Sequence, residues 1–197
     1  ITSNIEDPRL AQYDVESGRF FANAVDTETK GVDVVITYDW KLGGGNLNIN
    51  LAGNYTETKI TDFHFPENLV PSQGEYFGPD QINIIETLSP KTKASLGLNY
   101  AIGKFNFMVR NTYFGQVIRD GYPFGKVQKF SPKVVTDVSV GYDITKNINL
   151  TIGANNAFDV FPDLQIYENS YYGVFKYAPV QMGTLGSYFF GRLNFNF

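Results

Sequence analysis

Apolar and polar residues alternate with a period of two along most of this chain. Between residues 32 and 40, one face carries Val32, Val34, Ile36, Tyr38 and Trp40, and the other carries Asp33, Val35, Thr37 and Asp39. Successive side chains of a β-strand point to opposite faces, so this period predicts strands. We predict seven, at about residues 20–40, 46–60, 91–102, 104–118, 132–145, 147–157 and 185–197. A helical period is nowhere sustained.

The connections between these strands alternate between short and long. Short turns rich in Gly and Asn are expected at residues 41–46, 103–104 and 145–147, and long loops at about 61–90, 119–131 and 158–184. Gly and Asn supply the positive φ angles that tight hairpins need. The pattern predicts an all-β, antiparallel up-and-down meander with its short turns at one end. Transmembrane barrels, with short periplasmic turns and long external loops, have this arrangement.

The two faces of the predicted strands differ in charge. No charged residue lies near the middle of an apolar face, where a Lys or Arg facing lipid would cost about 2–4 kcal/mol. The opposite face is rich in Asn, Ser, Thr and Gly and carries Asp33, Arg110, Asp137 and Arg192. Soluble sandwiches and lipocalin-like barrels also alternate. We favour a membrane barrel because a solvent-facing sheet surface usually carries more Lys and Glu. The apolar residues are then expected to face outward.

Composition narrows the range of functions. The chain has 197 residues, 43% of them hydrophobic, with 17 Phe and 13 Tyr that gather near strand ends, as in the aromatic girdles of membrane proteins. The net charge of −4, without Lys or Arg clusters, gives no reason to expect nucleic acid as a partner. With no Cys and a single His, we expect no catalytic centre, metal site or cofactor. No apolar run approaches the roughly 18 residues of a membrane helix.

Few polar residues suggest chemistry. His64 is interpreted as a surface residue, and Asp159 and Asp163 as turn-capping residues, because two carboxylates are too few for Ca²⁺. Ligand contacts are more plausible in the long external loops, where aromatic rings could stack on a substrate. The candidate ligand-binding residues are Tyr76, Phe77, Arg119, Tyr122, Tyr171 and Tyr172. The alternative is that such aromatics pack the loops against one another.

Several stretches resemble a known family. The ending GRLNFNF resembles the terminal strand that the barrel-assembly machinery reads in outer-membrane proteins, with Leu193, Phe195 and Phe197 as the signal. Residues 28–40 resemble the Lys-Gly-Val-Glu strand of TonB-dependent receptors, with Asp33 in place of Glu. NNAFDVFPD is similar to their Asn-Asn-Leu-Phe-Asp element, with Ala157 in place of Leu. The resemblance covers about residues 20–197, and the variants resemble those of Bacteroidetes receptors.

The resemblance implies a 22-stranded barrel of the bacterial cell outer membrane, filled by an N-terminal plug. Such receptors import a scarce nutrient, for example a siderophore, haem, cobalamin or a glycan, and are driven by the TonB complex. We interpret residues 1–197 as the C-terminal part of such a barrel, with residues 1–18 as the tail of an external loop. The implied partners are outer-membrane lipid, the barrel-assembly machinery, the TonB complex and a small nutrient ligand.

Two alternatives stay open at this point. One is a complete small outer-membrane barrel with an adhesin or structural role, which would need an eighth strand within residues 1–21. The other is a soluble lipid-binding β-barrel. Under the receptor interpretation, an unclosed seven-stranded sheet has two open edges, so other chain segments or copies of the chain are expected beside it.

Overall fold

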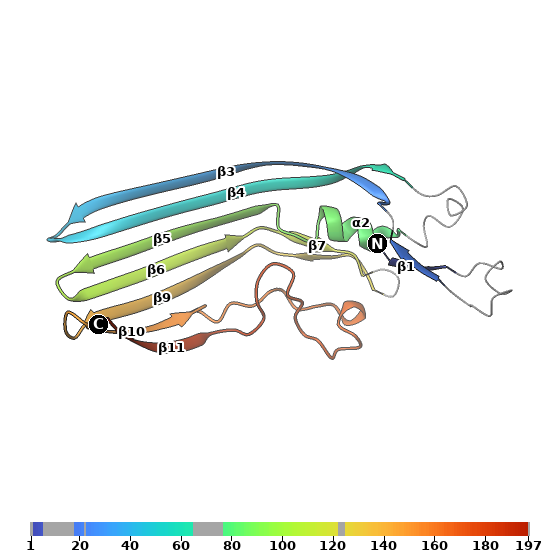
Figure 1. Cartoon of the computed structure of the whole chain (residues 1–197). Coiled ribbons are helices and arrows are strands. Elements are labelled where there is room, and N and C mark those ends of the chain that lie inside the picture. The colour runs from blue at the N-terminus through green and yellow to red at the C-terminus, as the bar shows by residue number, and fades with distance from the viewer. Residues whose placement is uncertain (1, 6–17, 22, 65–76, 122–124, 197) are drawn as a thin grey trace.

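The dominant element of the fold is one antiparallel sheet of seven strands (Figure 1). The structure, a computed structural model, describes residues 2–5, 18–21, 23–64, 77–121 and 125–196. In the order β11-β10-β9-β6-β5-β4-β3, each strand pairs with its neighbours along the chain. The strands are β3 (Val25–Leu42), β4 (Gly45–Phe63), β5 (Thr92–Ile102), β6 (Phe105–Phe114), β9 (Lys133–Asp143), β10 (Ile148–Asn155) and β11 (Tyr188–Phe195). This confirms the predicted all-β meander.

Turn chemistry explains the hairpins. Gly43 and Gly44 form the two-residue turn between β3 and β4, with φ of +56° and +81°, values that Gly adopts without strain. The turn at 103–104 begins with Gly103 at φ +57°. In Figure 1 the short turns lie together at one end of the sheet, and the long connections lie at the opposite end. This is the asymmetry that the sequence predicts.

The structure corrects some predicted boundaries. Residues 18–21 do not belong to the first long strand; they form β2 (Gly18–Phe21), which pairs with β1 (Thr2–Ile5) in a separate sheet. The segment 1–18, expected to be only a loop, therefore contains a strand. Strand β6 stops at Phe114, and β7 (Val117–Arg119) pairs instead with β8 (Gln128–Phe130). The chain leaves the large sheet after Gly115, whose N–H donates to the carbonyl of Thr92.

The structure also contains helices that the sequence did not predict. Helix α2 (Pro79–Glu86) lies in the loop between β4 and β5, and η3 (Tyr167–Asn169) is a single 3₁₀ turn. Pro79 suits the first helical position, and the Gln81 side chain accepts from the N–H of Gly78. Because β4 and β5 are antiparallel, α2 is not a crossover between parallel strands. No helix within the described residues is long and apolar enough to cross a membrane.

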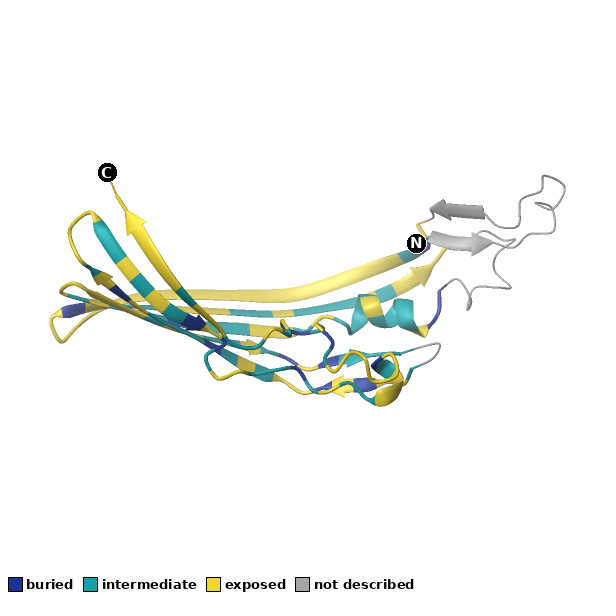
Figure 2. Cartoon of the chain, turned by 90° about the horizontal axis from the view of Figure 1, so that it is seen from below, coloured by how far each residue is buried: buried dark blue, intermediate teal, exposed yellow. Residues whose placement is uncertain are grey.

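The two faces of the sheet are chemically distinct. Leu96, Val109, Val140 and Leu150 share the apolar face and do not enclose a core; each is 36–40% exposed. Figure 2 shows the strands as one curved layer in which exposed residues recur along every strand. The polar face is hollowed near the short turns, with a volume of about 420 Å³ lined largely by Asn, Ser, Thr and Gly.

Side chains on the polar face bond to one another across strands. Asn54 donates to Asp33, and Asn149 donates to Asp143, at 2.7 and 2.8 Å. Thr37 donates to Asn50 at 2.9 Å. These bonds satisfy polar groups on a surface that we expect to be wet, and they add cross-strand stabilisation to the backbone ladder.

Candidate functional site

The buried core of the described chain lies among the long loops. Val117 and Phe130, on the paired strands β7 and β8, pack with Ala178, and Leu88 and Val180 cover this cluster. Burial of a side chain the size of Phe130 contributes about 1.5–3 kcal/mol. The cluster therefore joins the connections that follow α2, β6 and β10 into one packed unit, here called the loop unit.

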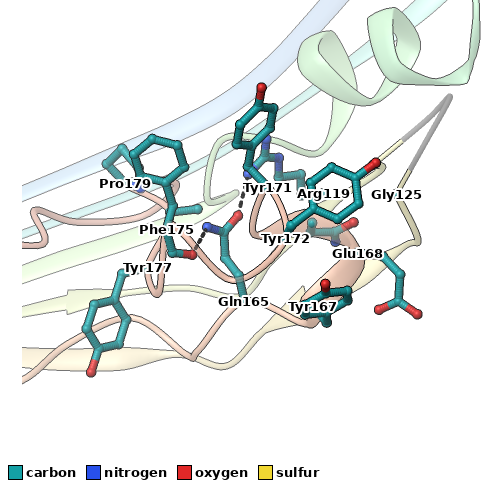
Figure 3. Close-up of a pocket in the computed structure, with 13 residues that line it drawn as sticks. Arg119, Gly125, Gln165, Tyr167, Glu168, Tyr171, Tyr172, Phe175, Tyr177 and Pro179 are labelled. Carbon is teal, nitrogen blue, oxygen red and sulfur yellow. Dashed lines mark hydrogen bonds between the residues drawn. The ribbon is translucent and has the colours of Figure 1, made fainter.

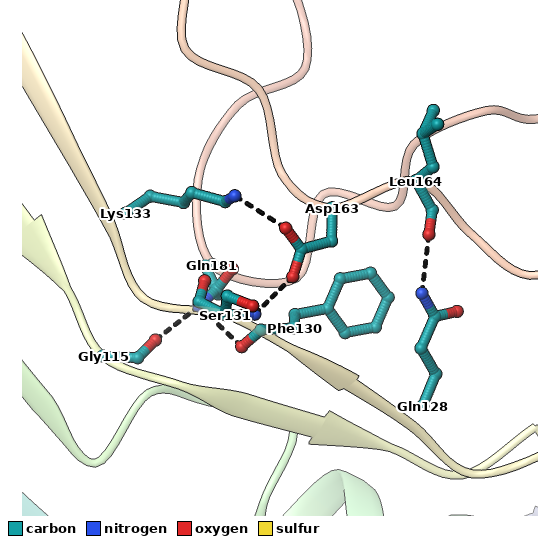
Figure 4. Close-up of polar contacts among 8 residues, drawn as sticks. All are labelled: Gly115, Gln128, Phe130, Ser131, Lys133, Asp163, Leu164 and Gln181. Atoms are coloured by element: carbon teal, nitrogen blue, oxygen red, sulfur yellow. Dashed lines mark hydrogen bonds and ion pairs between the residues drawn. The ribbon is translucent and has the colours of Figure 1, made fainter.

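Gln181 is the central polar contact of the loop unit (Figure 4). Its side chain is buried, and its amide nitrogen donates to the carbonyls of Gly115, Phe130 and Ser131. One side chain of the connection after β10 thus bonds to three backbone acceptors of the connection after β6. Gln181 therefore links the connection after β10 to the connection after β6.

An ion pair and a backbone hydrogen bond join the same two connections at a second point. Lys133 lies 2.6 Å from Asp163, which also accepts from the N–H of Ser131. Burial of Asp163 favours its neutral form, but the bonds from Lys133 and Ser131 outweigh burial and hold the pKa of Asp163 below its ordinary value. The carboxylate is therefore charged and structural at neutral pH.

The NNAFD stretch forms the turn that leads into the longest connection. Asn156, at φ +49°, exchanges two hydrogen bonds with Val160, and Asp159 accepts from the N–H of Ser187 at 2.9 Å. Asp159 bonds to Ser187, and Asp163 bonds to Ser131 and Lys133, so both carboxylates join distant segments instead of capping their own turns as the sequence predicts. In the described part of the chain, no three His, Asp or Glu residues group together as metal ligands would.

A hollow of about 750 Å³ opens on the loop unit (Figure 3). Arg119, Gly121, Gly125 and residues within 165–179 line it. Four exposed aromatic residues, here called the aromatic rim, border it: Tyr167, Tyr171, Tyr172 and Phe175. Their neighbouring ring centroids are 6.0–6.4 Å apart. These rings present flat apolar faces, while amide and charged groups lie beside them.

The backbone turn that presents the rim is strained. Tyr171 and Tyr172 have φ of +52° and +57°, and Gly173 follows at +86°. Non-Gly residues in this region cost about 1–3 kcal/mol each. The hydroxyl of buried Ser170 holds the turn, because it donates to the carbonyl of Tyr167 and accepts from the N–H of Gly173. Such strain is typical of segments that present side chains to a ligand.

Charged residues flank the hollow. The guanidinium of Arg119 donates to the side-chain oxygen of Gln165 at 2.9 Å, and Gln165 donates in turn to the carbonyl of Phe175 at 2.8 Å. Glu168 forms an ion pair with Lys126, and this bond holds the pKa of Glu168 below its ordinary value. Arg119 is partly buried, whereas the four rings are exposed.

The predicted ligand residues do not all meet. Arg119, Tyr171 and Tyr172 line the same hollow. Phe77 lies elsewhere, 4% exposed, with its ring edge-on to Phe63. Tyr76 and Tyr122 fall outside the described residues. Sequence reasoning missed the amides Gln165 and Asn169, which also line the hollow; the nearby Tyr-rich segment was the only signal for them.

The predicted terminal signal lies on an edge strand. Leu193 and Phe195 share one face of β11, and both are exposed. They stand opposite Leu150 and Ile148 of β10. Phe197 is outside the described residues. Strand β11 and β3 are the two edges of the sheet.

Comparison with known families identifies the class of protein. The family model "TonB dependent receptor-like, beta-barrel" matches residues 2–157, which is most of the chain. The chain therefore belongs to the TonB-dependent receptor β-barrel family, and it is an outer-membrane protein. The assignment favours the receptor interpretation over the two alternatives weighed from the sequence.

Solved structures show the same fold. The FpvAI–pyocin S2 complex matches at 14% identity and a TM-score of 0.56, over 98% of this chain and 22% of that one. P. aeruginosa FpvA bound to heterologous pyoverdines matches at 15% identity and a TM-score of 0.56, over 98% of this chain and 23% of that one. The copper transporter OprC matches at 22% identity and a TM-score of 0.54, over 100% of this chain and 27% of that one. The chain thus spans about a quarter of these proteins. A search of curated proteins found no match.

Proposed function

We propose that residues 1–197 form the C-terminal part of the barrel wall, and a share of the external ligand-binding surface, of a receptor that imports a scarce nutrient. Residues 1–18 are then part of an external loop. The observation that carries this proposal is the hollow with its aromatic rim, built on the long-loop end of a sheet whose hollowed face is polar. Its volume of about 750 Å³ falls in the range of small-molecule sites.

The proposed ligand classes are a siderophore, haem, cobalamin or a glycan. Each has a flat or apolar surface on which Tyr and Phe rings can stack. Fold relatives support transport of this kind, since FpvA is described in complex with iron-loaded pyoverdines and OprC as a copper transporter. Arg119, Tyr171 and Tyr172 are the proposed contacts, with Tyr76 and Tyr122 as further candidates. Phe77 would support the loops from within. We propose binding and no covalent chemistry.

The proposed partners follow from the two faces and the family. The apolar face would contact outer-membrane lipid, and the TonB complex would act through an N-terminal region outside this chain. The sequence variants at Asp33 and Ala157 support a Bacteroidetes origin as part of the proposal.

The test replaces rings of the aromatic rim in the intact receptor. Tyr171→Ala with Tyr172→Ala should raise the half-saturating nutrient concentration roughly tenfold, because each lost stacking contact is worth about 0.5–1.5 kcal/mol. Growth on siderophores, haem, cobalamin and glycans, each as the limiting source, is measured beside the amount of receptor at the surface. Phe158→Ala, an exposed ring of the same connection outside the hollow, is the control. Unchanged growth on every nutrient would contradict the proposal.

We also propose that Leu193, Phe195 and Phe197 are read by the barrel-assembly machinery. A Phe at the membrane interface buries only part of its surface and contributes about 1–2 kcal/mol to stability. Phe197→Ala should therefore lower the amount of receptor that reaches the outer membrane, while the assembled fraction transports normally. Phe190→Ala, on the opposite face of β11, is the matched control. Normal assembly with impaired transport would refute this role.

A further inference from the structure

We infer that the hollow selects ligands that carry an anionic group, with Arg119 as the residue that recognises this group and Asn83 and Gln165 as its positioning residues. The inference rests on the proposed function, because it concerns the same hollow. The inference goes further than the proposed function in two ways. It assigns a charge to the ligand, and it gives Asn83 and Gln165 a role that a search for aromatic loop residues does not reveal.

No carboxylate among the described residues neutralises the charge of Arg119. Within the described part of the chain no carboxylate forms an ion pair with Arg119, and Glu168, the acidic residue that lines the hollow, is paired with Lys126. A guanidinium has five N–H donors, and Arg119 uses one of them on Gln165. Donors therefore remain for a ligand, in the planar arrangement that suits a carboxylate or phosphate.

Asn83 fixes the backbone on both sides of Arg119. Its side chain donates to the carbonyl of Ile118 at 2.8 Å and accepts from the N–H of Asp120 at 2.9 Å. Both peptide groups that flank Arg119 are thus bonded to one side chain of α2. Thr87 adds a bond to the same Ile118 carbonyl at 3.1 Å. The direction in which β7 presents Arg119 is therefore set by a different connection of the loop unit.

Gln165 fixes the other end of the Arg119 side chain. Its oxygen accepts from the guanidinium, its amide nitrogen donates to the carbonyl of Phe175, and its backbone N–H donates to Lys176. Figure 3 shows Gln165 between Arg119 and the backbone of Phe175. Because Gln165 is neutral, it orients the guanidinium and leaves its charge available. A cation held in place before binding saves the entropy of ordering it.

The ligand class follows from these groups together. The aromatic rim offers flat apolar faces, and the fixed cation lies beside them in a partly buried position, where charge–charge attraction is stronger than in bulk water. A ligand that joins a planar or apolar body to a carboxylate, phosphate or similar anionic group would satisfy both. A neutral ligand of the same shape would leave the guanidinium without a partner.

The test compares two probes of equal shape and different charge. Binding of naphthalene-2-carboxylate and naphthalene-2-carboxamide to the intact receptor in lipid nanodiscs is measured by calorimetry, with empty nanodiscs as the blank. We expect the acid to bind roughly tenfold more tightly than the amide, because a hydrogen bond between two charged groups is stronger than one to a neutral group. The preference should shrink as salt concentration rises.

Variants assign the preference to residues. Arg119→Gln should bring the acid-to-amide ratio to about one, and Arg119→Lys should keep part of it, because Lys retains the charge without the planar fork. Asn83→Ala and Gln165→Met should lower the ratio even though neither removes a charge. Lys129→Gln, which removes an exposed charge from neighbouring β8, is the matched control and should leave the ratio unchanged.

Each contrary outcome has a separate meaning. Equal binding of acid and amide to the unaltered receptor would overturn the inference and leave the proposed binding site standing. Binding of neither probe, together with unchanged growth of the Tyr171 and Tyr172 variant, would overturn both. An equal loss of preference in Lys129→Gln would show a diffuse field instead of recognition by Arg119. An unchanged ratio in Asn83→Ala would refute the positioning role.

Discussion

Asparagine side chains take three roles in this chain, and the role depends on the element. On the strands, Asn54 bonds across to Asp33 on the polar face. In a turn, Asn156 adopts a positive φ and bonds to the backbone four residues on. On α2, Asn83 joins its own connection to the one that follows β6. The sequence indicates the first two roles, since Asn in alternation or beside Gly is typical of strands and turns. The third depends on contacts that only the fold creates.

The residues around the hollow could also be predicted only in part from the sequence. Arg119, Tyr171 and Tyr172 could be proposed from loop position and residue type, because rings and charges in long loops are typical of binding surfaces. Phe77 has the same type and setting, yet it is buried against Phe63. Gln165 carries no distinguishing pattern. Which loop residues meet depends on how the connections pack on Val117 and Phe130, and local sequence does not encode that packing.

His64 is expected to titrate above its ordinary range. It lies just after β4, on the side of the long loops, with its ring nitrogen 2.8 Å from Asp26. The hydrogen bond to Asp26 and the nearby charges of Asp26 and Asp62 raise the pKa of His64 above 6.5. Asp26→Asn should return the pKa toward 6.5, which NMR titration of the His64 signal, assigned through His64→Gln, would measure.

The sign of the pH effect follows from that shift. Because the folded-state pKa is raised, the stabilisation from the pair is fully present below about pH 6.5, the unfolded value. It is lost as pH rises through the higher folded-state pKa. The end of the β3–β4 hairpin should therefore exchange amide hydrogens more readily above that pKa, relative to Asp26→Asn. A His64 pKa that Asp26→Asn leaves unchanged would contradict the pairing.

At the scale of elements, long strands and short loop structures differ in how far sequence predicts them. The seven strands have eight to nineteen residues, long enough for a period of two to be evident. Helix α2 has eight residues and no buried side chain, so its pattern is too short to show a helical period. Strands β7 and β8 have three residues each and owe their pairing to the buried cluster on which they pack.

Gln181 should hold the loop unit together. Gln181→Leu removes the donor for three backbone carbonyls, and a buried acceptor left without a partner costs about 1–3 kcal/mol. The two connections can remove that cost by opening to water. Amide exchange and protease cleavage should therefore increase in residues 115–131 and 158–187 of the intact receptor. The ladder between β4 and β5 should keep its protection.

Gln116→Leu is the control for this prediction. Gln116 is exposed and lies next to one of the same carbonyls, so its replacement changes side-chain chemistry without removing a buried donor. Hydrogen–deuterium exchange of both variants separates a local effect from general destabilisation. Equal protection of the two connections in Gln181→Leu and Gln116→Leu would show that the apolar cluster alone holds them.

At the scale of the whole molecule, the fold has an exposed apolar face, a hollowed polar face and two edges. Strands β3 and β11 each have one side without a partner strand among the described residues. An open edge and an apolar face both favour association in water. A barrel in a membrane resolves both, since closure pairs the edges and lipid covers the apolar face. The sequence predicts this arrangement from alternation and turn length together, although alternation alone leaves inside and outside undecided.

A lipid-facing surface should tolerate charge according to depth. Leu96 lies near the middle of β5, and Ile102 ends the same strand on the same face, beside the short turn. A Lys facing lipid costs about 2–4 kcal/mol at the midplane and about 0–1 kcal/mol near the interface. Leu96→Lys should therefore lower the unfolding free energy of the intact receptor in lipid vesicles by about 2–4 kcal/mol. Ile102→Lys should lower it far less, because its ammonium reaches water.

Denaturant titrations of the two variants beside the unaltered receptor measure both costs. Equal costs at the two depths would mean that this face does not look onto a hydrocarbon layer, and the membrane orientation of the sheet would be wrong.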